Sequence, residues 1–201
     1  MLLLRDAYLE LAGTVVNAST CCDVWWELQN AENPRHERYK SIVERYDLFF
    51  EANAGAQLVA MIVLLYQAYE TRSDTQNFHH FVERLSREEL AAAPLVASLR
   101  QQIGELKPIW SKVARARSTA IAHLSNWASS DILMQRAELT PNEIRALIVA
   151  SKNMLKEIAA YFGILGTALL EMNAVPDTRR LMQDLDRPDT TQATHDDART
   201  R

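Results

Sequence analysis

Residues that interrupt helices are scarce in this chain of 201 residues, which has only five glycines and six prolines. No stretch alternates apolar and polar residues with the period of two that a half-buried strand requires. Apolar residues recur instead at helical spacing. In the first expected helix, residues 2 to 30, they are Leu4, Tyr8, Leu11, Val15, Val24, Trp25 and Leu28. The sequence therefore predicts an all-α fold, an antiparallel helical bundle of four to five main helices.

The few interruptions mark the boundaries of the earlier helices. The Asn33-Pro34 pair ends the first helix, because proline cannot continue a helix easily. A second helical pattern runs from there to Thr71, and we expect one bent helix or two in series, since Gly55 predicts a kink or a close helix contact. The polar segment 71–76 then predicts a turn before a short helix.

Capping patterns and a proline mark the later helices. Ser86 with Glu89 forms one capping-box pattern, and Thr140 with Glu143 forms another, so we expect a helix to begin at each. Pro108 predicts a break between the two helices that lie between these capping boxes.

Composition indicates one folded domain followed by a tail. Hydrophobic residues make up 48% of the chain and charged residues 24%, as in ordinary globular proteins. The last long helix is expected to end near Asn173, so a single domain spans residues 1–173. Residues 174–201 are charged and polar with few large apolar side chains, which predicts a disordered tail.

The cysteines and the apolar runs bear on the compartment. The only cysteines, Cys21 and Cys22, are adjacent, which suits neither a disulfide between them nor a zinc site. The leucine-rich start lacks the apolar region of a signal peptide, because charged residues interrupt it at once. The most apolar run, Leu58–Tyr66, has nine residues, against roughly 20 for a helix that spans a bilayer. We expect a cytoplasmic protein without a membrane partner.

Charge excludes a general attraction to nucleic acid, because the net charge is -4. One segment nevertheless concentrates cations and contains a single acid, Glu105. The cations are Arg100, Lys107, Lys112, Arg115 and Arg117. This segment is either a surface that faces phosphate groups or an ordinary solvated helix face.

The end of that segment carries an arginine on an apolar stripe. At 100° per residue, the stripe consists of Trp110, Val113, Arg117, Ala120, Ile121 and Leu124. A buried arginine keeps its charge and needs an anion or a carboxylate, which Glu44 or Glu51 could supply. His123 lies about 120° around the axis and roughly 9 Å along it from Arg117. A structural and a catalytic role for His123 are both open on this pattern.

The stretch RSTAIAH, from Arg117 to His123, resembles the RxxxxxH motif of HEPN domains, the helical domains of many prokaryotic defence and toxin ribonucleases. The stretch from Tyr46 to Leu85 resembles the abortive-infection branch of that family, in which a long apolar helix leads through a polar turn containing Asp to a short helix. The resemblance covers most of residues 35–172. The residue after the arginine is usually Asn in the family, and here it is Ser118.

The resemblance implies metal-independent cleavage of RNA, with no metal and no cofactor. Arg117, His123 and Ser118 would be the catalytic residues, at a site that two copies of the chain form in a homodimer. Lys112 and Arg115 would bind the RNA backbone. Such an enzyme would act as a toxin or as an abortive-infection effector against phage, and an antitoxin partner could restrain it.

Two other interpretations compete with the nuclease. A HEPN-like dimer without catalysis would serve as an RNA-binding or protein-interaction module, which Ser118 in place of Asn favours. In a plain helical bundle, Arg117 and His123 would be structural. No other motif competes, because the adjacent His79 and His80 point about 100° apart on a helix and cannot chelate one metal together. The spacing of the four tryptophans indicates packing anchors.

Overall fold

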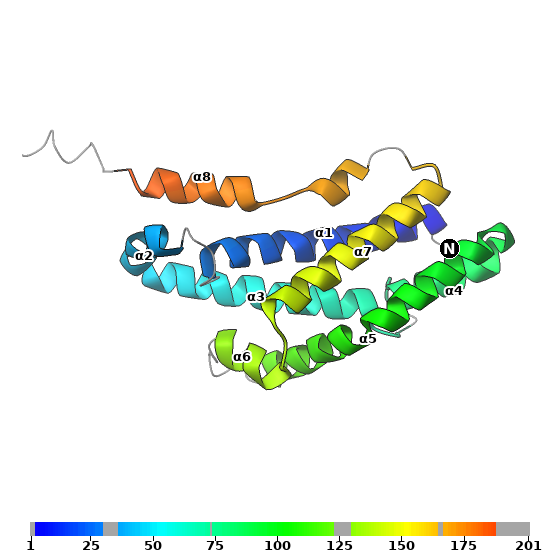
Figure 1. Cartoon of the computed structure of the whole chain (residues 1–201), viewed down its shortest axis with the longest axis horizontal. Helices are drawn as coiled ribbons and strands as arrows, with labels where there is room; N and C mark the ends of the chain where they lie inside the picture. The colour runs from blue at the N-terminus through cyan, green and yellow to red at the C-terminus, as the bar shows by residue number, and fades with distance from the viewer. Residues whose placement is uncertain (1–2, 30–35, 73, 123–129, 165–166, 188–201) are drawn as a thin grey trace, which may run out of the picture.

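The computed structural model confirms the all-α prediction over the residues it describes, which are 3–29, 36–72, 74–122, 130–164 and 167–187 (Figure 1). Its helices are α1 (Leu4–Gln29), α2 (His36–Arg45), α3 (Asp47–Tyr69), α4 (Phe78–Glu88), α5 (Ala93–Ala122), α6 (Ser130–Ala137), α7 (Pro141–Tyr161) and α8 (Val175–Leu185), with 3-10 helices at Leu90–Ala92 and Thr167–Glu171. The four long ones, α1, α3, α5 and α7, contain 26, 23, 30 and 21 residues.

Helices α1 and α3 run antiparallel along the centre of the bundle, and α7 lies against α1 while α5 lies against α3 (Figure 1). One large cluster of buried apolar side chains joins these four helices with α4 and α6. Its largest fully buried aromatic members are Tyr69, Phe78 and Phe81. The Tyr69 hydroxyl lies 2.7 Å from the Ser151 hydroxyl, which links α3 to α7 inside the core. Burial of this apolar surface is the main term that stabilises the bundle.

The break between α2 and α3 lies at Tyr46 rather than at Gly55. Tyr46 leaves the helical conformation (φ -122°, ψ 38°), and Asp47 then opens α3 with a negative charge in the first turn, where the helix dipole favours it. Gly55 lies inside α3. The alternative of two helices in series is therefore the one that the structure supports.

The capping box expected at Ser86 is wrong, because Ser86 lies inside α4. Asn77 caps that helix instead, and its side chain accepts a hydrogen bond of 2.8 Å from the backbone N–H of His80. The following helix α5 starts at Ala93, which places Pro94 in its first turn, where a missing N–H does no harm.

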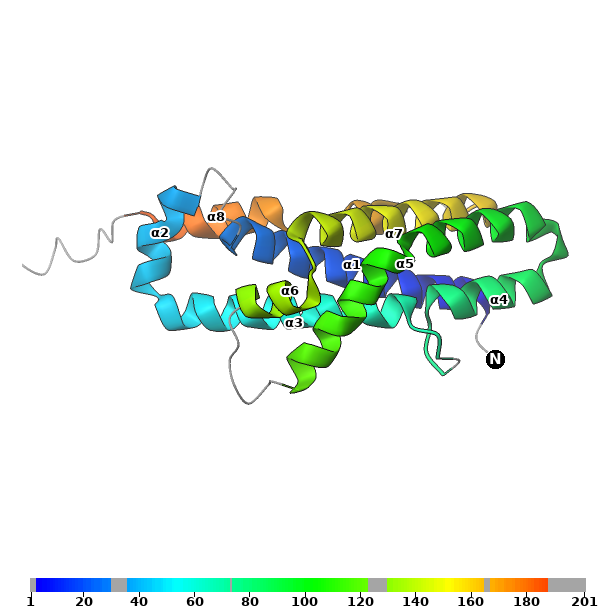
Figure 2. The same cartoon turned by 60° about the horizontal axis from the view of Figure 1, so that its bottom comes forward.

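The break expected at Pro108 is also wrong, because α5 continues through this proline. Proline has no N–H, so the carbonyl of Gly104 loses its usual donor four residues on. Helix α5 accordingly changes direction along its length, and its second half leaves the line of the first (Figure 2). The bend lets one helix lie against α4 and α7 at one end and against α6 at the other.

The capping box at Thr140 is confirmed. The Thr140 hydroxyl accepts a hydrogen bond from the Glu143 N–H at 3.2 Å, and the Glu143 carboxylate accepts one from the Thr140 N–H at 2.9 Å. Helix α7 ends at Tyr161 rather than near Asn173. Gly163 adopts a left-handed conformation (φ 59°), and the N–H of Ile164 reaches back to the carbonyl of Ala159, as in a glycine-based helix stop.

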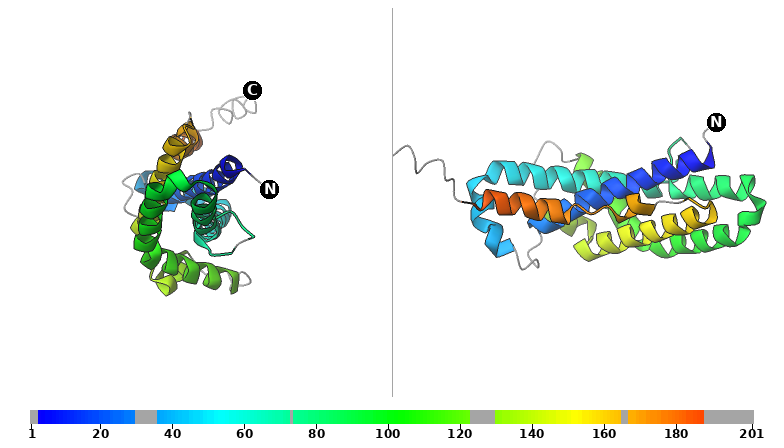
Figure 3. Two further views of the ribbon diagram at one scale, coloured as in Figure 1. Left: turned by 90° about the vertical axis from the view of Figure 1, so that its right-hand side faces the viewer. Right: turned by 90° about the horizontal axis from the view of Figure 1, so that it is seen from above.

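A helix occupies part of the segment that we expected to be a disordered tail from 174 to 201. Helix α8 lies beside α1 and α2 (Figure 3). Met182 is fully buried in a second apolar cluster with Leu28, Tyr39, Ile42 and Phe50. Arg179 donates hydrogen bonds to both oxygens of the Glu27 carboxylate, the shorter at 2.7 Å. Residues 188–201 lie outside the described part of the chain.

Helix α3 is long and apolar enough to cross a membrane by length and composition, and 33% of its most apolar stretch is buried. Core helices of helical bundles can be equally long and apolar, and α3 contributes eight buried side chains to the core. The absence of a membrane partner stays a prediction.

Removing the Met182 side chain tests whether α8 is docked. Met182→Ala is expected to destabilise the protein by about 2 kcal/mol or more, because it leaves a cavity in a packed cluster. The neighbouring Leu181 is 49% exposed, so Leu181→Ala is the matched control and should change stability by no more than about 0.5 kcal/mol. Urea unfolding of both variants measures the difference. Equal midpoints for the two variants would contradict the docked helix.

Candidate functional site

The second half of α5 positions the arginine of the predicted motif. Val113 and Ala116 are fully buried, and this fixes the rotation of the helix about its own axis. Arg117 follows directly and is half-buried, while Ser118 is exposed. Arg117 therefore lies at the margin of the core, with its aliphatic stem covered and its charged end near the surface.

The guanidinium of Arg117 lies over the ring of Tyr66 on α3, with its carbon 4.8 Å from the ring centroid. Tyr66 in turn stacks against Trp110, with ring centroids 6.4 Å apart and an interplanar angle of 20°. A cation placed in this way is attracted to the electron-rich ring face without losing its charge. Arg117, Tyr66 and Trp110 thus form a continuous row, which we call the aromatic row.

Arg117 has no acidic partner among the described residues. Glu44 and Glu51, the acidic residues that the sequence offers as partners, are exposed on α2 and α3 and do not pair with it. A ring face occupies one side of the guanidinium but accepts none of the in-plane hydrogen bonds that its N–H groups can donate. The positive charge is therefore held in a defined place and is left unneutralised by the described part of the chain.

The two residues expected to bind RNA, Lys112 and Arg115, are each engaged in an ion pair. The Lys112 amine lies 2.6 Å from the Glu143 carboxylate on α7. Arg115 lies 3.4 Å from Glu138, and both of these side chains are mostly exposed. An exposed pair of this kind is weak and opens easily. Lys112 is therefore the more firmly held of the two, and Arg115 is the freer cation.

The Ser118 hydroxyl donates a hydrogen bond of 3.1 Å to the carbonyl of Ala114, one turn back on the same helix. This contact is common for serine within helices and uses the only proton that the hydroxyl can donate. The oxygen can still accept a hydrogen bond.

The remaining catalytic residue of the prediction, His123, lies outside the described residues, as does Trp127. The described part of α5 ends at Ala122, the residue before His123. The structure thus describes the surroundings of Arg117 and Ser118, and the predicted pairing of Arg117 with His123 stays a prediction.

Sequence reasoning missed Tyr66, Glu138 and Glu143 as neighbours of the basic segment. Glu143 was already assigned to a capping box, and the structure uses its carboxylate twice, for the cap and for Lys112. Tyr66 ends an apolar run, which marks it as a core residue but does not indicate a cation on its ring. Tyr66 lies on α3, Glu143 on α7 and Glu138 just after α6, so only the packing of α5 against these helices brings the groups together.

The described residues include potential metal ligands and two cysteines. No three His, Cys, Asp or Glu side chains among them lie close enough together to hold a metal ion. Both cysteines are free. Burial, with a smaller contribution from Asp23, raises the pKa of the Cys22 thiol to about 12, so this thiol is protonated at neutral pH and is a poor nucleophile.

Comparison of the chain with protein-family models, with curated proteins and with solved structures gives no match.

The Lys112–Glu143 pair predicts a measurable pH dependence. The hydrogen bond from Lys112, followed by those from Thr140, lowers the pKa of Glu143 below its usual value. Because the folded-state pKa is the lower one, the stabilisation is fully present above the usual value of about 4.3 and is lost as pH falls through the depressed value. Lys112→Met should therefore raise the pKa of Glu143 in an NMR titration of the carboxyl carbon.

The matched control is Arg115→Met, which removes the neighbouring cation that pairs with Glu138 instead. This variant should leave the pKa of Glu143 where it is in the wild-type protein. A Glu143 carboxyl that titrates at its usual value in the wild-type protein would contradict the ion pair.

Proposed function

We propose that this protein is a metal-independent endoribonuclease of the HEPN type, acting as a toxin or an abortive-infection effector. The observation that carries the proposal is the Arg117 guanidinium, which lies over Tyr66 without an acidic partner among the described residues. A buried or half-buried arginine normally pairs with a carboxylate. An arginine held in place with its charge free is suited to bind a phosphate group.

The reaction would be an internal transfer at one phosphodiester. The 2'-hydroxyl of the RNA attacks the adjacent phosphorus, the bond to the 5'-oxygen breaks, and a 2',3'-cyclic phosphate and a 5'-hydroxyl result. His123 would take the proton from the 2'-hydroxyl or give one to the leaving 5'-oxygen, for which an unperturbed pKa near 6.5 is suited. Arg117 would stabilise the charge that builds on the phosphate oxygens. Ser118 would accept a hydrogen bond that orients the RNA.

The proposed enzyme is a homodimer, and α3 offers a surface for the second copy. Apolar residues on one exposed or half-exposed face of this helix alternate at spacings of three and four residues, as at helix-helix contacts. They are Phe49, Ala52, Ala56, Val59 and Val63. Phe49 is 62% exposed and Val63 38%. The stripe leads to Tyr66, whose ring lies against Arg117, so two copies that pack these stripes in parallel about a two-fold axis would bring both Arg117 side chains to one cleft.

The competing function is a HEPN-like dimer that binds RNA or a protein without cleaving RNA. The Ser118 hydroxyl favours it, because its proton is already donated to Ala114 within the helix. This alternative shares the anion-binding arginine and the dimer with the nuclease. It differs in having no role for His123 as an acid or base.

Cleavage of RNA by the purified protein in the presence of a chelator tests the nuclease. His123→Ala should slow cleavage by roughly 10²- to 10⁴-fold, because an acid-base group is lost. Arg117→Ala should slow it by roughly 10²- to 10³-fold, because the developing charge loses its stabilising donor. The products of the wild-type protein should carry 2',3'-cyclic phosphate ends.

Arg87→Ala is the matched control, since Arg87 is an exposed cation on α4 away from the aromatic row. Its rate should equal that of the wild-type protein. RNA binding by folded wild-type protein with no cleavage above that of His123→Ala would move the assignment to the inactive dimer.

A charge on the α3 stripe tests the dimer. Ala56→Arg should give the mass of one chain, 22.8 kDa, in light scattering, while the wild-type protein gives the mass of two. Val149 is 58% exposed on α7, so Val149→Arg is the matched control and should stay dimeric. RNA cleavage should fall with Ala56→Arg alone. A wild-type protein that cleaves RNA as a single chain would rule out the shared site.

A further inference from the structure

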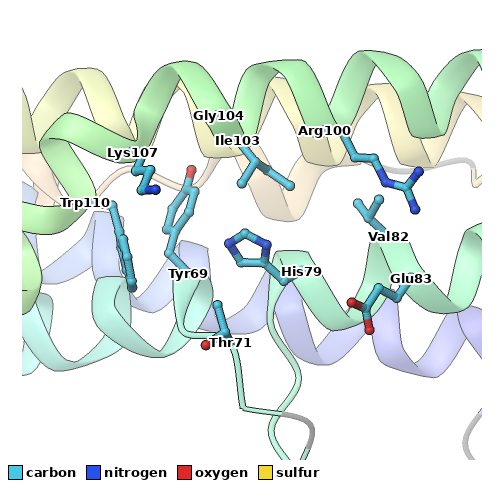
Figure 4. Close-up of a pocket in the computed structure, with 10 residues that line it drawn as sticks. All are labelled: Tyr69, Thr71, His79, Val82, Glu83, Arg100, Ile103, Gly104, Lys107 and Trp110. Atoms are coloured by element: carbon cyan, nitrogen blue, oxygen red, sulfur yellow. The ribbon is translucent and has the colours of Figure 1, made fainter.

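A cavity of about 330 Å³ lies beside the aromatic row, between the end of α3, helix α4 and the first half of α5 (Figure 4). Its floor is apolar and is made by the buried side chains of Tyr69, Val82 and Ile103. Its volume is at the lower end of the range for small-molecule sites. The cavity is therefore large enough for one nucleotide-sized molecule and too small for an extended ligand.

The mouth of the cavity carries more positive than negative charge. Arg100 and Lys107 are exposed cations on α5, and Glu83 on α4 is the only acidic residue among the ten that line the cavity. Neither Arg100 nor Lys107 forms an ion pair or a side-chain hydrogen bond with any part of the chain that the structure describes. Both are free to bind an anion, in contrast to Lys112 and Arg115 further along the helix.

A glycine lines this mouth. Gly104 lies four residues after Arg100 and three before Lys107, so it occupies the same face of α5. A Cβ atom added at Gly104 would meet nothing within 4 Å. Glycine is unfavourable inside a helix, and no tight contact requires it here. Its effect at this position is to leave out a side chain that would narrow the entrance.

Two rings supply the contacts that a planar ligand needs. Trp110 and His79 both line the cavity, and the ring of Tyr69 is drawn between them (Figure 4). Burial lowers the pKa of His79, so its ring is neutral at pH 7 and offers one hydrogen-bond donor and one acceptor. Neither ring nitrogen of His79 is bonded to a described residue.

We propose that this cavity binds a nucleoside monophosphate unit, with its base against Trp110 and its phosphate at Arg100 or Lys107. Flat apolar walls favour a base, because every base has a face that stacks on an aromatic ring. Free cations at the mouth favour a phosphate over a neutral ligand. The neutral donor and acceptor of His79 suit the polar edge of a base.

The unit is either a free nucleotide or one nucleotide of an RNA strand. Trp110 and Arg117 are seven residues apart on α5, which is roughly 10 Å along a helix axis, and Tyr66 contacts both. A strand whose phosphate lies at Arg117 could therefore place a neighbouring base in the cavity. The RNA source rests on the proposed ribonuclease function, whereas binding of the nucleotide itself does not.

Calorimetric titration of the full chain with AMP, GMP, CMP and UMP, each alone, tests the cavity. At least one nucleotide should bind, and Gly104→Leu should weaken that binding by about tenfold or more, because the new side chain fills the entrance. Leucine is a better helix former than glycine, so the variant should stay folded, which circular dichroism checks. The double variant Arg100→Ala/Lys107→Ala should weaken nucleotide binding, and Arg87→Ala should not.

A second titration uses a four-nucleotide RNA with the His123→Ala protein, so that binding is measured without cleavage. RNA binding that Gly104→Leu weakens identifies the strand as the source, and binding of mononucleotides alone identifies the free nucleotide. Either result supports the nucleotide cavity, whatever the outcome of the cleavage assay. Failure of all four mononucleotides and of the RNA to bind would overturn it, as would binding that Gly104→Leu leaves unchanged.

Discussion

Helix α3 contributes eight buried side chains to the core and lies against both α1 and α5. The rest of the bundle depends on this packing, because α1, α4 and α5 bury their apolar faces in the same cluster. The hydrogen bond between Tyr69 and Ser151 ties the end of α3 to α7. With α3 fixed on two sides, Tyr66 and Tyr69 take defined positions, and both the aromatic row and the cavity are built on that end of the helix.

Several apolar side chains on the other side of α3 are exposed or half-exposed within one chain. Most of the apolar stretch of α3 is not buried within one chain. Exposed apolar stripes of this length mark surfaces that meet a partner. The proposed dimer and the proposed phosphate site thus have one origin, since the same helix provides the contact surface and the ring that holds Arg117.

Local signals in the sequence predicted much of the fold, and the errors came from distant contacts. Thr140 and Glu143 form the expected cap because both halves of a capping box lie within four residues. Ser86 has the same pattern but is held inside α4, where tertiary packing outweighs a weak local preference. Met182 docks α8 through partners more than a hundred residues away in the chain, at Leu28 and Phe50. No local pattern records such partners.

In the candidate site, too, the sequence predicted the local features but not the contacts between distant residues. The position of Arg117 on an apolar helix stripe followed from helical periodicity, and the structure places Arg117 half-buried beside the buried Val113 and Ala116. Its contact with Tyr66 links residues 51 positions apart and depends on how α5 crosses α3. Spacing along one helix can therefore identify a chemically unusual residue, while the groups that set its charge and orientation come from other helices.

The proline in α5 also divides the helix into two parts with different attachments. Before Pro108 the helix carries Arg100 and Gly104 of the cavity, and Gln102 bonds to Glu157 on α7. After Pro108 it carries Trp110 at the cavity, Lys112, which pairs with Glu143 on α7, and Arg117. One backbone hydrogen bond is missing across the joint, because Pro108 has no N–H to donate to Gly104. Separating the two parts of α5 from each other therefore breaks one backbone hydrogen bond fewer than in a helix without proline.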